Sequence, residues 1–209
     1  MTQAAPFMKP DGELLVLASA SPARRQLLEN AGLLLDHQAA AVDEAEFKDS
    51  LAAEGATALQ TAETLAELKA GRVSRMWPGA LVIGADQMLD CNGTWFDKPR
   101  DRDHAAAHLR TLAGRMHTLE TSVCVVRDGE RLWHQNETAR LTMRDFGDSF
   151  INTYLAAAGD TVLGSVGGYC LEGQGVHLFS RVEGDFFTIL GLPLLPLLGY
   201  LRQRGAISG

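Results

Sequence analysis

The stretch Leu14–Leu28, which reads LLVLASASPARRQLL, sets the start of the fold. Its apolar run Leu14–Leu17 is typical of a buried strand. Ser21 and Pro22 then form a helix start, with serine as the N-cap and proline at the first helical position. The sequence therefore predicts a strand, a short polar turn and a helix that ends near Gly32. Such a turn directs free backbone N–H groups at one point, which favours binding of an anion.

Two arginines, Arg24 and Arg25, fall in the first turn of this predicted helix. Cations are unfavourable there, because the N-terminal end of a helix carries partial positive charge. A bound phosphate would explain both side chains. The simpler interpretation is a solvated first turn with two surface arginines, and the stretch alone leaves both interpretations open.

The composition is that of an ordinary globular protein, with 46% hydrophobic and 22% charged residues in a chain of 209. A net charge of −7 gives no overall basic field, so neither nucleic acid nor an anionic membrane is expected as a partner. A phosphate-bearing substrate would need a local cluster of lysine and arginine. No apolar run approaches the roughly 20 residues of a membrane span.

The compartment is inferred from the cysteines and from the start of the chain. The cysteines are widely spaced and offer no CxxC pair or zinc-site spacing; they are Cys91, Cys124 and Cys170. Asp11 and Glu13 precede the first apolar run, where a signal peptide would be basic. We therefore expect a cytoplasmic protein. By its length the chain can bury a sizeable core, and we expect residues 1–12 to be a flexible N-terminal tail and residues 13–209 to be a single domain with two lobes.

Patterns of strand and helix alternate along the chain, which indicates an α/β fold. Asn92-Gly93 and Asp128-Gly129 predict two tight hairpin turns. An acidic loop is expected over residues 42–46. The expected strands lie at 33–39, 81–83, 118–126, 131–143 and 176–182, and the expected helices at 58–76, 101–113, 148–158 and 191–204.

Two carboxylates follow predicted strands. Asp86 comes at the end of the apolar strand 81–83, where open α/β sheets place ligand-binding groups, and Glu44 lies in the acidic loop. If both reach the same point, they could hold Mg²⁺ or Mn²⁺ or take a proton from water. The alternatives are that Asp86 caps a turn and that Glu44 is solvated.

Two lysines are candidates for binding phosphate. Lys69 lies late in a helix, where a cation suits the helix dipole, although a surface lysine is the alternative. Lys98 precedes Pro99, which favours an extended loop. Together with Arg24, these lysines would form a cationic clamp for a triphosphate.

The glycine-rich block Gly167–Gly175 matches neither a dinucleotide-binding fingerprint nor a P-loop. It predicts either a set of turns that need positive φ or one wall of a pocket. In the second interpretation Glu172 would accept from the N–H edge of a base.

Taken together, these motifs resemble the Maf family of nucleoside triphosphate pyrophosphatases, from Leu14 to Leu201. Each motif is weak alone, but the set is specific in this order and at these spacings. The matching pieces are Leu17–Pro22 with Arg24-Arg25, Val42–Glu44, Leu68–Ala70, Gly84–Gln87, Lys98-Pro99, Gly167–Tyr169 with Glu172-Gly173, and Gly191–Leu194.

The resemblance implies a central mixed sheet with helices on its faces, two lobes with a cleft between them, and a homodimer. The implied reaction is hydrolysis between the α- and β-phosphates of a nucleotide, which yields a monophosphate and pyrophosphate with a divalent metal, Mg²⁺ or Mn²⁺. By the family pattern Asp86 is the proton acceptor. The residues expected around the phosphates and the metal are Ser19, Arg24, Glu44, Lys69 and Lys98, with Glu44 and Asp86 as metal ligands.

Three positions are linked to substrate choice in the family, and here they hold Ala23, Gln87 and Glu172. Gln87 and Glu172 resemble the branch that acts on 7-methyl-GTP, and a carboxylate at 172 would accept from the N1–H and N2–H₂ donors of guanine. Ala23 departs from the tryptophan of that branch, whose ring would stack on a cationic methylated base. Two alternatives stay open: a dTTP and UTP pyrophosphatase, whose branch usually carries Arg, Thr and Gln at these positions, and a non-catalytic nucleotide-sensing regulator of cell division.

Overall fold

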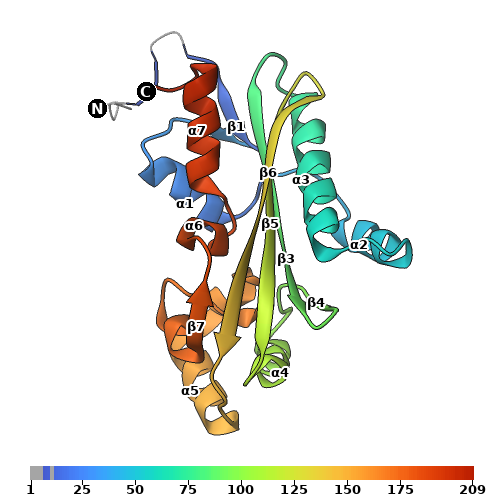
Figure 1. The fold of residues 1–209 in the computed structure, drawn as a ribbon, viewed down its shortest axis with the longest axis vertical. Helices are drawn as coiled ribbons and strands as arrows, with labels where there is room; N and C mark the ends of the chain where they lie inside the picture. Colours follow the sequence, from blue (N-terminus) through green and yellow to red (C-terminus); the bar gives the residue numbers. More distant parts are fainter. Residues whose placement is uncertain (1–6, 10–11) are drawn as a thin grey trace. The chain divides into compact units, whose positions relative to one another are not determined.

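The chain forms one mixed sheet in the strand order β2-β1-β3-β5-β6-β7, with β4 paired to β3 (Figure 1). The structure is a computed structural model that describes residues 7–9 and 12–209. β1 pairs in parallel with β2 and β3, whereas the β3–β4 and β6–β7 pairs are antiparallel. The predicted α/β class with a mixed sheet is therefore confirmed.

The chain divides into two compact units. The first unit comprises Met1–Asp86, Thr121–Glu137 and Gly191–Gly209, and the second comprises Gln87–Glu120 and Thr138–Leu190. Three long strands contribute residues to both units; they are β3 (Leu81–Cys91), β5 (Met116–Arg127) and β6 (Glu130–Met143). The expectation of a single domain with two lobes and a cleft stays a prediction.

The predicted helices are present with small shifts at their ends. The other elements of the first unit are β1 (Leu15–Leu17), α1 (Pro22–Asn30), β2 (Asp36–His37), α2 (Glu44–Ala53), α3 (Ala58–Ser74) and α7 (Leu194–Arg204). Those of the second unit are β4 (Thr94–Phe96), α4 (Arg102–Leu112), α5 (Asp148–Ala158), the short 3₁₀ segments η1 (Gly159–Gly164), η2 (Val166–Gly168) and η3 (Gln174–Leu178), β7 (Phe179–Glu183) and α6 (Phe186–Ile189). None of the described helices is both long enough and apolar enough to cross a membrane.

The predicted strand, turn and helix at the start of the chain are confirmed. All residues of β1 are buried, and Val16 pairs with Val82 of β3. The Ser21 side chain accepts from the N–H of Arg24 at 3.4 Å, and Pro22 opens α1. The N-terminus of α1 therefore follows the carboxyl end of β1, where α/β sheets present ligand-binding groups.

α3 approaches β3 very closely at Gly84. A Cβ at this position would lie 2.2 Å from the carbonyl oxygen of Ala66 and 2.7 Å from the Cβ of Ala70. Only glycine therefore allows the helix this approach to the strand. Ala66 and Ala70 belong to the core of the first unit. The contact brings α3, which carries Lys69, to the part of β3 that contains Asp86.

We expect Gly84→Ala to lower the free energy of unfolding by about 3 kcal/mol, because the added methyl group meets backbone and cannot be accommodated by a side-chain rotation. Gly71→Ala on α3 is the matched control, since a Cβ there would meet no atom within 4 Å. That change is expected to raise stability by up to about 1 kcal/mol. Urea unfolding measures both, and equal stability of the two variants would contradict the close approach.

The prediction of an acidic loop over residues 42–46 is wrong, because α2 begins at Glu44. The Asp43 side chain accepts from the N–H of Glu46 at 3.2 Å and so caps the helix. Acidic residues in the first turn also suit the helix dipole. The strand expected just before it, over residues 33–39, pairs only over Asp36–His37.

The prediction that Asp86 ends its strand is also wrong. β3 continues to Cys91, because Leu89 and Cys91 remain buried and pair with β4. The glycine-rich block forms η2 and η3 with turns between them, and Gly167 and Gly168 have φ of +76° and +78°. The following strand begins at Phe179, later than expected.

The flexible tail expected over residues 1–12 falls largely outside the described residues, since residues 1–6 and 10–11 are not among them. In the described part of this segment, Met8 forms an isolated antiparallel bridge with Ile207. The carbonyl oxygen of Phe7 accepts from the N–H of Ser208 at 2.8 Å. These contacts join the described residues of the segment to the end of the chain.

A candidate phosphate and metal site

Lys69 joins two carboxylates that come from different elements. Its Nζ lies 2.6 Å from Oδ1 of Asp86 in β3 and 2.8 Å from Oε1 of Glu44 at the start of α2. Lys69 and Asp86 are only 6% and 4% exposed. The alternative interpretation of Lys69 as a surface residue is therefore wrong, and three of the predicted residues meet.

One buried oxygen of this cluster has no hydrogen-bond partner in the described part of the chain. Oδ2 of Asp86 is buried and makes no hydrogen bond among the described residues. An unpaired buried acceptor costs free energy, so such an atom calls for a donor or a cation from outside the chain. Oδ2 therefore has the character expected of a ligand to a metal or to a water molecule.

Glu44 and Asp86 fit a hard divalent cation. Carboxylate oxygens are the ligands that Mg²⁺ and Mn²⁺ prefer, and Mg²⁺ is commonly held by one or two carboxylates together with waters and substrate phosphates. In the part of the chain that the structure describes, no group of three or more His, Cys, Asp or Glu is placed to hold a metal. Binding of a metal by these two carboxylates therefore stays a prediction.

The start of α1 brings Arg24 to the same group of charges. Its Nη1 donates to Oγ of Ser19 at 3.3 Å, and its Nε donates to the carbonyl oxygen of Gly191 at 2.7 Å. Burial lowers the pKa of the Arg24 guanidinium from its usual value, and the negative charges of Asp86 and Glu44 oppose this. Arginine stays protonated because its usual pKa is so high. The first unit thus brings together Ser19, Arg24, Glu44, Lys69 and Asp86.

The remaining predicted residues are distributed over both units. Ala23 belongs to α1 in the first unit, next to Arg24. Lys98 and Glu172 are exposed residues of the second unit, the first after β4 and the second between η2 and η3. Their part in binding a substrate stays a prediction.

Gln87 bonds to backbone within the second unit. Its Nε2 donates to the carbonyl oxygens of Thr188 and Ile189, at 2.9 and 3.3 Å. These carbonyls belong to the last two residues of α6. Gln87 therefore holds the end of α6, which the sequence did not indicate, and its part in substrate choice stays a prediction.

Gly191 is a neighbour of the site whose role the sequence did not indicate. It lies in the motif Gly191–Leu194, which was expected to open the last helix, although α7 begins only at Leu194. Its contact with Arg24 spans 167 positions of the sequence. No local sequence pattern predicts a contact over such a distance. The only sign of a role for Gly191 was its place in the motif Gly191–Leu194.

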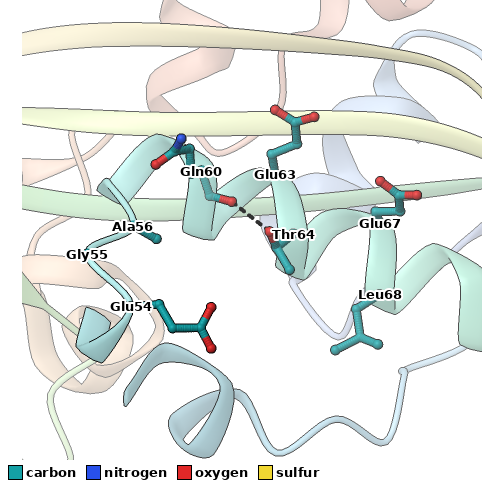
Figure 2. A pocket seen from close by; sticks show the side chains of 8 residues that line it. All are labelled: Glu54, Gly55, Ala56, Gln60, Glu63, Thr64, Glu67 and Leu68. Atoms are coloured by element: carbon teal, nitrogen blue, oxygen red, sulfur yellow. Dashed lines mark hydrogen bonds between the residues drawn. The ribbon is translucent and has the colours of Figure 1, made fainter. Parts of the chain in front are cut away.

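A separate hollow of about 760 Å³ lies in the first unit along α3, beside the end of α2 (Figure 2). None of the predicted site residues lines it; the lining residues are Glu54, Gly55, Ala56, Gln60, Glu63, Thr64, Glu67 and Leu68. Glu63 and Glu67 each lie 2.8 Å from Nη1 of Arg131. Glu63 also accepts from Asn136 at 2.7 Å, and this hydrogen bond is the main cause that lowers the pKa of Glu63. These two carboxylates therefore join α3 to β6.

Fold and site together define an α/β protein with an open mixed sheet. Carboxylate side chains and positively charged side chains meet in it near the N-terminus of the first helix. The family model described as Maf-like protein matches residues 14–204, and the chain belongs to this Maf family. The resemblance predicted from the motifs is therefore confirmed.

Curated relatives match this chain over nearly their whole length. A protein of Granulibacter bethesdensis named nucleoside triphosphate pyrophosphatase is 55% identical over 194 residues, which are 93% of this chain and 98% of the relative. One of Paramagnetospirillum magneticum with the same name is 56% identical over 92% of this chain and 99% of the relative. One of Rhizobium meliloti, named 7-methyl-GTP pyrophosphatase, is 52% identical over 96% of this chain and 100% of the relative.

Proposed function

We propose that this chain hydrolyses a nucleoside triphosphate between its α- and β-phosphates and releases a nucleoside monophosphate and pyrophosphate. The observation that carries the proposal is the buried ion pair between Nζ of Lys69 and Oδ1 of Asp86, at 2.6 Å. The negative charge of Asp86 also acts on Arg24 at the start of α1. The names of relatives that are 52–56% identical support the same class of reaction.

In this proposal the phosphates bind at the start of α1. Free N–H groups at a helix N-terminus favour an anion, and the Arg24 guanidinium adds a charge-assisted donor. The Ser19 hydroxyl, which accepts from Arg24 at 3.3 Å, has its own hydrogen left to donate to a phosphate oxygen. These donors stabilise negative charge that develops on the phosphates as the bond between them breaks.

Asp86 takes the proton of the attacking water. Lys69 occupies Oδ1 and fixes the carboxylate, so that Oδ2, which has no partner among the described residues, is left to accept the proton. Oδ1 thus holds the carboxylate in place through Lys69, and Oδ2 takes the proton.

Glu44 and Asp86 would hold a divalent cation, Mg²⁺ or Mn²⁺, with Asp86 using the second lone pair of Oδ1 so that Oδ2 stays the proton acceptor. When bound, the cation neutralises phosphate charge and orients the phosphates. Nζ of Lys69 lies within 2.8 Å of both carboxylates. Its positive charge therefore limits the repulsion between them while no cation is bound.

For the substrate we propose 7-methyl-GTP or another modified guanine nucleotide. Glu172 would accept from the two N–H donors on the guanine edge, and a relative named 7-methyl-GTP pyrophosphatase is 52% identical to this chain. Ala23 lacks the ring that would stack on a cationic base, and it also differs from the arginine of the dTTP and UTP branch, which stays the runner-up.

A panel of triphosphates with Mg²⁺ or Mn²⁺ tests the proposal. We expect pyrophosphate to be released faster from 7-methyl-GTP than from dTTP or UTP, and EDTA to stop the reaction. A preference for the pyrimidine nucleotides would contradict the substrate but keep the reaction. Tight nucleotide binding without any release of pyrophosphate would contradict the reaction and favour a sensing role.

A further inference from the structure

The guanidinium of Arg24 is oriented by a backbone carbonyl from the far end of the sequence. Its Nε donates to the carbonyl oxygen of Gly191 at 2.7 Å, whereas its bond to Ser19 is longer, at 3.3 Å. A guanidinium is a rigid fork of five N–H donors, so fixing the Nε–H sets the direction of all the others. The bond to the Gly191 carbonyl is thus the shorter of these two hydrogen bonds and the main one that aims this fork.

Gly191 combines this carbonyl with a backbone that suits glycine. Its φ is +98°, a region that residues with a side chain rarely adopt. A Cβ at this position would also lie 3.4 Å from Nε and 3.5 Å from Nη2 of Arg24. These distances are ordinary van der Waals contacts, so a side chain here would act mainly by straining the turn that carries the carbonyl.

We propose that Gly191 is a positioning residue for Arg24: its carbonyl aims the guanidinium at the phosphates, and its positive φ sets the direction of that carbonyl. The proposal rests on the proposed function in one respect, that Arg24 binds phosphate. It explains why a glycine opens the motif Gly191–Leu194 three residues before α7 begins. The mechanism needs no contact between Gly191 and the substrate.

The test is a double-mutant cycle of Gly191→Ala and Arg24→Lys, with KM and kcat measured for the best nucleotide of the panel. Each change is expected to raise KM about 10-fold or more, because a charge-assisted bond to phosphate is misaligned or lost. Lysine keeps the charge but not the fork, so the double variant should be no worse than Arg24→Lys alone. Additive effects, or an unchanged KM in either single variant, would overturn the proposal.

Gly79→Ala is the control for backbone strain. Gly79 has φ of +76°, but a Cβ there would meet no atom within 4 Å. Both glycine variants should lose thermal stability, and only Gly191→Ala should bind phosphate more weakly. A similar rise of KM in Gly79→Ala would show that strain alone accounts for the effect and would overturn the proposal.

Binding of inorganic tripolyphosphate, measured by calorimetry, separates this proposal from the proposed reaction. If the protein hydrolyses no nucleotide but binds tripolyphosphate, and Gly191→Ala weakens that binding about 10-fold, the positioning role stands without the reaction. If the unaltered protein binds no tripolyphosphate, or if Gly191→Ala binds it equally well, the positioning role is wrong. Should Gly191→Ala fail to fold, Arg24→Lys tests the other end of the same bond, because it keeps the charge but removes the Nε–H donor; unchanged binding of tripolyphosphate would then overturn the positioning role.

Discussion

Asp86→Asn is expected to lower kcat about 10²- to 10⁴-fold while leaving the fold intact, which is the usual contribution of a general base. Asparagine has the shape of aspartate, and its Oδ1 can still accept from Nζ of Lys69, which lies 2.6 Å from Oδ1 in this structure. The change replaces Oδ2, which has no hydrogen-bond partner among residues 7–9 and 12–209, by an amide nitrogen that cannot take a proton. KM should change much less than kcat.

Asp90→Asn is the matched control, because Asp90 lies in the same strand but caps the hairpin. Its side chain accepts from the N–H of Gly93 at 2.9 Å and from Nε1 of Trp95 at 3.0 Å. We expect near-normal kcat from this variant. Pyrophosphate release measures both, and circular dichroism checks the fold. If Asp86→Asn kept more than a tenth of the normal kcat, Asp86 could not be the proton acceptor.

Local signals were sufficient for the start of the fold. The apolar run before Ser21, the N-cap and Pro22 each act within a few residues, and the structure has the strand, turn and helix that they predict. α2 has a weaker signal of burial, since none of its residues is buried and its large apolar residues are only Phe47 and Leu51, four positions apart. Its other indication was Asp43, whose side chain accepts from the N–H of Glu46 and whose role as a cap the acidic composition of the segment obscured.

The identities of the site residues could be predicted, but their contacts could not. The motifs supplied Arg24, Lys69 and Asp86 as candidates, because each residue type suits phosphate or metal chemistry. Their placement depends on contacts between distant parts of the chain, such as the approach of α3 to Gly84 and the bond from Arg24 to Gly191. Spacing along a sequence does not encode such contacts when no homologous sequences are compared.

Lys69→Met is expected to destabilise the fold by about 3–5 kcal/mol, the usual effect of removing one partner from a buried ion pair. Methionine fills a similar volume but leaves the carboxylates of Asp86 and Glu44, each within 2.8 Å of Nζ, without their shared cation. Asp86 is 4% exposed, so water can compensate little for the loss. Activity should fall about 100-fold or more, because the proposed phosphate site would also lose a positive charge.

Lys48→Met on α2 is the matched control for Lys69→Met, because Lys48 is only partly buried. Its loss is expected to cost no more than about 1 kcal/mol, as for other lysines near the surface. Urea unfolding of both variants separates the two roles of Lys69. If Lys69→Met is as stable as Lys48→Met, the ion pair adds nothing to the fold; if it then also keeps its activity, Lys69 has no part in binding phosphate.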